Sequence, residues 1–284
     1  KKLNSDELYE KMKSIQKKYD VNIYSVESGL SSSGVDLGSG YVMPLNKPSA
    51  MMLIGTGVRS YEAGEVWHLL DQRVGMPITK VPMRNFDNIS MDKYNVLVLV
   101  SGNYKFSDNQ IEKIKTWAEN GNTIISIGSG SKLLIDKKIV DENLLEKEES
   151  NTMNYLAYGD ARENRGKEQI GGVILNSIID LSHPLAFGYE NNTLPLYKNN
   201  SIWLKPSKNN YSSVVRYSEN SLIDGFLSEN NKAKIKESVS LVVSRVGRGI
   251  AVMFADNPNF RGAWYGTNRL FLNAILLGDK IYIP

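Results

Sequence analysis

The stretch NVLVLV (residues 95–100), followed by SGN (101–103), decides the fold. A continuous apolar run rich in valine predicts a strand that is buried on both faces, and the serine and glycine predict a turn after it. Downstream, Ser107 and Gln110 have the spacing of a capping box, so we expect a helix that ends before Gly121. A second apolar strand is predicted at Thr123–Ile127. Strand, helix and strand in this order indicate a parallel, helix-covered sheet.

The same alternation extends in both directions from this unit. Upstream, a strand at Ala50–Ile54 precedes Gly55-Thr56-Gly57, a helix over 61–74 and a strand over 78–83. Near the carboxyl end, residues 238–245 and 250–254 predict an antiparallel hairpin, and 268–277 a final helix. We therefore expect an α/β three-layer sandwich with a mainly parallel sheet, flavodoxin-like in plan, with an antiparallel hairpin near the C-terminus.

The sequence predicts a short lead-in before this α/β domain. Ser5 begins an amphipathic helix, residues 21–26 read as a strand, and the glycine- and serine-rich residues 29–40 read as a loop. We place the boundary after residue 48, which gives a lead-in and linker over 1–48 and an α/β domain over 49–284. Two stretches of that domain, 136–167 and 191–231, are expected to be elaborations, because one is weakly periodic and the other has four Asn-Asn pairs that favour exposed turns.

Composition excludes several classes of function. The 284 residues include no cysteine, which excludes disulfides, thiolate metal sites and a cysteine nucleophile. The formal charge of +3 comes from Lys and Arg spread along the chain, so we expect no nucleic-acid partner. No apolar run approaches the roughly 18 to 20 residues of a membrane span. The amino terminus lacks an initiator Met and reads as a processed end or as a cut inside a longer protein.

Polar side chains cluster in the loops that follow the predicted strands, where α/β sheets bind ligands. We expect a binding pocket there and no cofactor. Arg261 could hold an anionic group of a ligand, and Glu62 or Glu65 a cationic one, so a zwitterionic peptide fragment is the ligand class expected first. The candidate residues are Ser60, Glu62, Glu65, Ser101, Asn103, Ser129, Asp256, Asn257 and Arg261.

Three further patterns suggest chemistry but have ordinary structural interpretations. Ser129 and Lys132 spell S-x-x-K, so an independent serine-type hydrolase using Ser129 or Ser101 is one alternative to a Gly-rich turn. His68, Asp71 and the distant His183 imitate a zinc site, although a helix face and a turn account for both histidines and no metal site is expected. The aromatic 260–265 loop could bind sugar or peptide, or pack beneath the final helix.

Several long motifs resemble a known family. They are SYEAGEVWHLLD (60–71), HPLAFGY (183–189), ADNPNFRG (255–262), and the stretch from ESGL (27–30) to GVDLGS (34–39). Over roughly residues 5–284 the chain resembles the class I glutamine amidotransferase-like domain that follows the catalytic domain in bacterial zinc carboxypeptidases of the carboxypeptidase A-like class. The resemblance implies a zinc peptidase domain in the same polypeptide, and export to the periplasm or outside the cell.

The resemblance also implies that this domain lacks amidotransferase chemistry. Where those enzymes place the nucleophilic cysteine, the register set by Gly130 and Leu133-Leu134 puts Gly128. Where they place a histidine and an acid after the last strand, the sequence reads ADNP (255–258), so the general base is missing as well. We therefore expect a non-catalytic accessory domain that packs on or orients the peptidase domain and binds a peptide or sugar ligand in a vestigial pocket.

Overall fold

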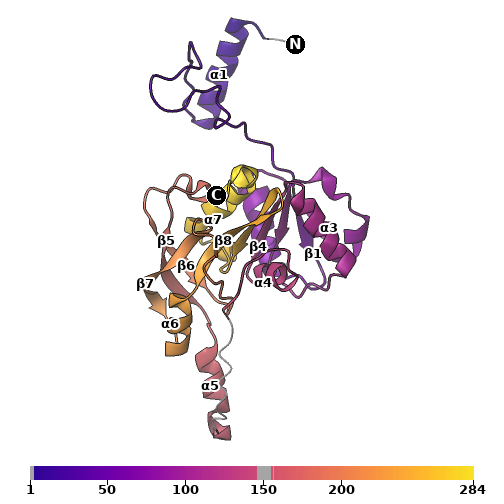
Figure 1. Cartoon of the computed structure of the whole chain (residues 1–284), viewed down its shortest axis with the longest axis vertical. Helices are drawn as coiled ribbons and strands as arrows, with labels where there is room; N and C mark the ends of the chain where they lie inside the picture. Colours follow the sequence, from indigo (N-terminus) through magenta and orange to yellow (C-terminus); the bar gives the residue numbers. More distant parts are fainter. Residues whose placement is uncertain (1–2, 146–154, 156) are drawn as a thin grey trace. The chain divides into compact units, whose positions relative to one another are not determined.

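The structure is a computed structural model that describes residues 3–145, 155 and 157–284. The chain divides into two compact units, residues 1–44 and 45–284 (Figure 1). In the smaller unit, helix α1 (Ser5–Tyr19) begins at a capping box in which Asn4 Oδ1 accepts from the amide of Glu7 at 2.8 Å. The strand expected over 21–26 does not form. A strand needs a neighbour for its hydrogen bonds, and the described part of residues 1–44 contains no strand that could provide one.

The described residues of the larger unit form a nine-stranded sheet in the order β2-β1-β3-β4-β9-β8-β7-β5-β6. Strands β2, β1, β3, β4 and β9 run parallel, and the remaining four extend the sheet by antiparallel pairing. The strand bounds are β1 Ala50–Ile54, β2 Thr79–Pro82, β3 Val96–Leu99, β4 Thr123–Ile127, β5 Val173–Ile179, β6 Thr193–Lys198, β7 Ser213–Gly225, β8 Val239–Val246 and β9 Gly249–Phe254.

Helices cover both faces of the parallel strands. Alternate residues of β1 contact opposite sides, with Met52 in one hydrophobic core and Met51 in the other. Helices α2 (Ser60–Trp67) and α7 (Tyr265–Leu277) contribute to the first core, and α3 (Asp108–Glu119) and α4 (Ser129–Asp136) to the second. The expected three-layer α/β sandwich with its C-terminal hairpin, β8 and β9, is thus confirmed.

The prediction that 191–231 consists of exposed turns was wrong for most of that stretch. It contributes β6 and β7 to the sheet, and helix α6 (Glu229–Lys236) begins at its end. The Asn-Asn pairs do mark turns and helix starts, since they flank β6, precede β7 and open α6. The strand expected around Ile202 is reduced to isolated bridges from Leu204 to Leu144 and Val239. In the other elaboration the structure has helix α5 (Ala161–Glu168), while 146–154 and 156 lie outside the described residues.

The parallel strands end level with one another, and this positions the site. Ile127 at the end of β4 pairs with Phe254 at the end of β9, and Leu99 at the end of β3 pairs with Ser126. The loops after β1, β3, β4 and β9 therefore leave the sheet at one edge. Helix α2 continues as a π-helix over His68–Val74 and ends at Gly75, which has a φ of 70°.

Candidate functional site

The turn between β4 and α4 has the place of a nucleophile elbow but presents no nucleophile. Gly128 has φ 54° and ψ −118°, a conformation that favours glycine, and its amide donates to the Phe254 carbonyl at 2.8 Å. A Cβ atom at this position would collide with the hydroxyl oxygen of Ser101. The space that a nucleophilic side chain would enter is thus occupied by a serine from the neighbouring strand end.

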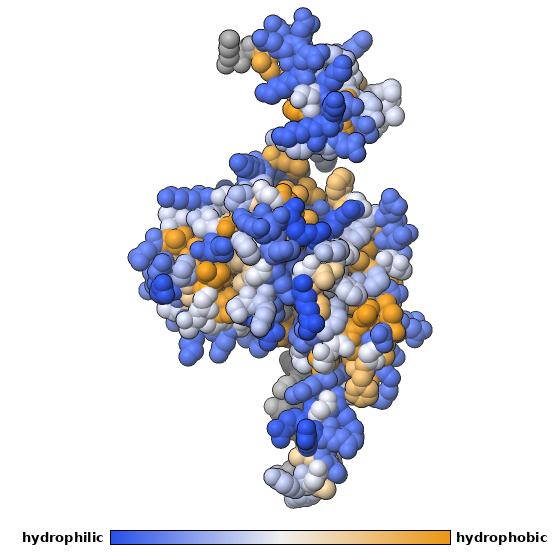
Figure 2. Space-filling view, turned by 180° about the vertical axis from the view of Figure 1, so that it is seen from behind, coloured by the Kyte–Doolittle hydropathy of each residue, from blue (hydrophilic) through white to orange (hydrophobic). Residues whose placement is uncertain are grey.

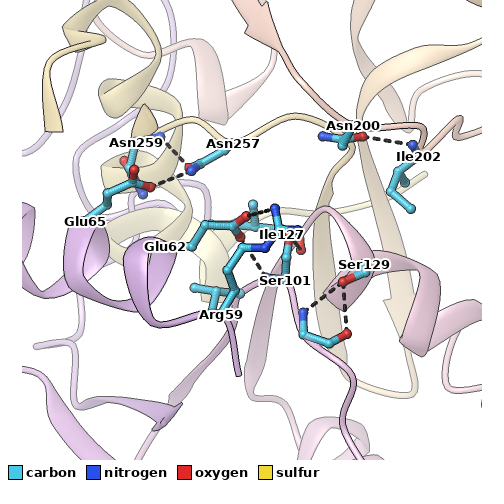
Figure 3. Close-up of polar contacts among 12 residues, drawn as sticks. Arg59, Glu62, Glu65, Ser101, Ile127, Ser129, Asn200, Ile202, Asn257 and Asn259 are labelled. Atoms are coloured by element: carbon cyan, nitrogen blue, oxygen red, sulfur yellow. Dashed lines mark hydrogen bonds and ion pairs between the residues drawn. The ribbon is translucent and has the colours of Figure 1, made fainter. Parts of the chain in front are cut away.

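The two serines considered as nucleophiles are bound to backbone groups. Ser129 Oγ accepts from the Gly102 amide at 2.8 Å and donates to the Gly102 carbonyl at 3.0 Å (Figure 3). Ser101 Oγ donates to the Ile127 carbonyl at 3.3 Å. Lys132, the lysine of the S-x-x-K pattern, pairs with Asp136 at 2.8 Å. Within the described part of the chain neither serine hydroxyl bonds to a histidine or lysine, so neither has the base that a serine hydrolase requires.

A cavity of about 1060 Å³ lies beside the elbow, between α2 and the 257–262 loop. Five of the expected site residues line it, namely Ser60, Glu62, Glu65, Asn257 and Arg261, whereas Ser101, Asn103, Ser129 and Asp256 do not. Asn103 is exposed and contributes its amide to the Gly57 carbonyl at 2.6 Å. The lining also includes residues that the sequence did not single out for a ligand, namely Arg59, Tyr61, Gly64, His68, Asn199, Phe260 and Gly262.

Glu62 is used as a brace between α2 and the end of β3. Its side chain is buried, and one carboxylate oxygen accepts from the Ser101 amide at 2.8 Å. The other oxygen pairs with the Arg59 guanidinium at 3.3 Å (Figure 3). Both oxygens therefore already have partners from the protein.

Glu65, one turn further along α2, holds the loop that follows β9. Its carboxylate accepts from Asn257 Nδ2 at 2.5 Å and from the backbone amide of Arg261 at 2.6 Å. Burial raises the pKa of Glu65, and the negative charge of Glu62 adds to this, while the two hydrogen bonds act in the opposite direction. The carboxylate thereby joins two separate segments of the cavity wall.

Arg261 has a backbone conformation that arginine rarely adopts, with φ 53° and ψ 17°. The bond from its amide to Glu65 holds it there, and Gly262 continues the loop with φ 60°. The guanidinium lies 5.2 Å from the centre of the Phe260 ring and forms no ion pair among the residues that the structure describes. A cation with its side chain free is thus fixed at its backbone in the wall of the cavity.

Asp256 was expected to join this site and instead points into the sheet. It is 4% exposed and contacts Lys198 Nζ at 3.0 Å, the Tyr217 hydroxyl at 2.6 Å and the Ser240 hydroxyl at 2.7 Å. Lys198 is fully buried and also donates to the Ile202 carbonyl at 2.8 Å. The prediction was wrong because β6, β7 and β8 lie beside the end of β9 and enclose this carboxylate.

The aromatic residues of the 260–265 loop pack mostly against the protein. Phe260 stacks on Tyr197 with ring centres 3.8 Å apart, and Trp264 Nε1 donates to the Pro195 carbonyl at 3.3 Å. The Arg73 guanidinium lies 4.1 Å from the centre of the Tyr265 ring. Of the three, Phe260 also lines the cavity.

The two histidines have separate surroundings. His68 is exposed at the cavity, whereas His183 Nδ1 accepts from the Leu185 amide at 3.1 Å and caps the short helix Pro184–Ala186. Burial lowers the pKa of His183, although the nearby Asp180 charge opposes this. Among the described residues no group of three or more His, Asp and Glu side chains is placed to hold a metal ion. In the same residues no helix is long and apolar enough to cross a membrane.

Comparison with known proteins identifies the fold. No protein-family model matches the chain, and no curated protein matches it. A chain of PurLQS from Thermotoga maritima is 15% identical with a TM-score of 0.50, and the match covers 80% of this chain and 97% of that one. A ThuA-like protein from Parabacteroides merdae is 14% identical with a TM-score of 0.55, covering 82% and 90% respectively. The chain therefore has a glutamine amidotransferase-like, ThuA-like α/β fold.

Proposed function

We propose that this chain is a non-catalytic accessory domain of an exported bacterial zinc carboxypeptidase. In this proposal it packs on or orients a peptidase domain of the same polypeptide and binds a ligand in the cavity beside α2. The amidotransferase-like fold and the resemblance of the 60–71, 183–189 and 255–262 motifs support the assignment. The zinc and its ligands would belong to the peptidase domain.

The observation that carries the non-catalytic part is the filled elbow. Acyl-transfer chemistry on this fold needs a nucleophile at the strand-to-helix turn and a base that activates it. Gly128 has no side chain, the Ser101 hydroxyl fills the space beside it, and Asp256 after β9 is bound to Lys198. The fold is thus retained without the groups that would perform the reaction.

The surface of the larger unit is compatible with packing on another domain. Large aromatic side chains are exposed there, including Tyr61 at 85%, Phe187 at 74% and Phe226 at 64%. Figure 2 shows separate hydrophobic patches among hydrophilic residues on one face. Exposed apolar groups of this kind occur at surfaces that contact other proteins or ligands.

Two measurements test the proposal. A fluorophosphonate probe should not label the purified chain, and glutamine should not be hydrolysed by it, with an active serine hydrolase and an active glutaminase as positive controls. Labelling that disappears in Ser129→Ala or Ser101→Ala, but persists in Ser60→Ala, would establish the hydrolase alternative instead. The full-length protein should contain a zinc carboxypeptidase domain with a His-x-x-Glu pair and a later histidine, and a different neighbouring domain would contradict the accessory role.

A further inference from the structure

We propose that the cavity binds the carboxylate of a peptide or N-acylated amino acid through Arg261, and that it does not select for an ammonium group. This inference rests on the proposed function insofar as it takes the cavity to be a binding site. It narrows the zwitterionic ligand expected from the sequence to its anionic end. The argument depends on which polar groups of the wall are already bonded within the protein.

The acidic groups of the wall are occupied. Each oxygen of Glu62 and each oxygen of Glu65 already has one protein partner, at distances between 2.5 and 3.3 Å (Figure 3). An ammonium group would have to compete with the bonds that hold the 257–262 loop to α2. Breaking a bond from a buried or half-buried carboxylate leaves a polar group without its partner, which is unfavourable.

The donor groups of the wall are free. The guanidinium of Arg261 has no carboxylate partner, because Glu65 bonds to the backbone amide of the same residue. Among the described residues the side chains of His68 and Asn199 also form no hydrogen bond, and both line the cavity. The unoccupied polarity of the cavity therefore consists mainly of donors, and a guanidinium matches the two oxygens of a carboxylate.

The remaining wall suits an organic acid with an apolar body. Phe260 is fixed by stacking on Tyr197 beside the guanidinium, and Tyr61 is exposed at the same cavity. The volume of about 1060 Å³ is at the upper end of the roughly 300 to 1,000 Å³ of small-molecule sites. Glu62 and Glu65 disfavour a doubly charged phosphate more than a singly charged carboxylate, because like charges repel.

A matched set of probes tests the inference on the purified chain. N-benzoylglycine carries a carboxylate and an aromatic ring, N-benzoylglycinamide lacks the charge, and phenyl phosphate carries a different anion. Binding can be followed by ligand-observed NMR titration. We expect the acid to bind the wild-type chain more tightly than the amide and the phosphate.

Two arginine variants separate the site from general electrostatics. Arg261→Ala should weaken binding of N-benzoylglycine about tenfold or more, as expected for loss of a charged hydrogen bond. The backbone bond to Glu65 remains in this variant, so its thermal unfolding should match that of the wild type. Arg84→Ala removes an equal charge from an exposed arginine outside the cavity and should leave the affinity unchanged.

The proposal is overturned by equal affinity for acid and amide, by tighter binding of phenyl phosphate, by an unchanged affinity in Arg261→Ala, or by failure of the acid to bind the wild-type chain. None of these results bears on probe labelling or on the identity of the neighbouring domain. A failure of this inference and a failure of the proposed function are therefore distinguishable.

Discussion

The ion pair between Lys198 and Asp256 is the most sharply testable element of the larger unit. Lys198 is fully buried, and besides Asp256 its ammonium group contacts the Ile202 carbonyl and lies 4.4 Å from the centre of the Trp203 ring. Burial lowers the pKa of Lys198, and the Asp256 charge opposes this shift. The substitution Lys198→Met keeps a long apolar side chain and removes the charge.

The expected loss follows from what the substitution leaves behind. Asp256 would remain buried as a carboxylate with the Tyr217 and Ser240 hydroxyls as donors and no counter-charge, and the Ile202 carbonyl would lose its donor. Breaking a buried ion pair by removing one partner typically costs about 3 to 5 kcal/mol. Adding Asp256→Asn removes the uncompensated charge, so the double variant should be more stable than the sum of the single losses, by about 0.5 to 3 kcal/mol.

Urea unfolding followed by tryptophan fluorescence measures these differences. With a slope of about 1 to 3 kcal/mol/M, the midpoint of Lys198→Met should fall by about 1 M or more at an unchanged slope. The exposed pair of Lys132 and Asp136 is the control, because Lys132→Met should cost less than about 1 kcal/mol. A Lys198→Met midpoint that matches that of Lys132→Met would refute the reasoning.

Three other substitutions test local features. Gly128→Ala should cost at least the roughly 1 to 3 kcal/mol of a strained backbone, and Ser101→Gly in the same chain should recover part of that loss in a urea titration, since the colliding hydroxyl is gone. The folded-state pKa of His183 is lowered, so its stabilising contribution is complete above about pH 6.5 and is lost as the pH falls below that value. His183→Asn keeps an acceptor for the Leu185 amide, so its stability should depend less on pH between about pH 7 and 5.5; equal slopes would contradict this. Ser107→Ala removes the α3 capping box and should lower the unfolding free energy by about 1 kcal/mol.

The parallel half of the sheet was predictable because its strands are buried on both faces. Strands β3 and β4 are continuous apolar runs that end at glycine or serine turns, and the capping box of α3 fixes where the helix between them begins. Strand β6 has alternating burial and flanking Asn-Asn pairs, which gave its turns but concealed the strand. Residues 21–26 show the opposite error, because an apolar stretch does not reveal whether a partner strand exists.

The candidate site was predictable as far as the level strand ends determine it. The loops after β1 and β9 meet at one edge, and this brings Glu65 to Asn257 and Arg261. What the sequence could not provide was the order of the antiparallel strands, which places Tyr217 and Lys198 beside Asp256. Exposed residues such as Tyr61 and Asn199 carry no sequence signal that distinguishes a cavity wall from ordinary surface.

These contacts explain why a nucleophile alone would not give this fold amidotransferase activity. Gly128→Cys would bring its Cβ against the Ser101 hydroxyl, so the thiol could enter only with a shift of the β3 end that Glu62 braces. A base would still be missing, because Asp256 is bonded to Lys198 and Asn257 is bonded to Glu65. The two positions after β9 that could support catalysis are thus both used to hold the structure, and one of them fixes the wall in which Arg261 stands.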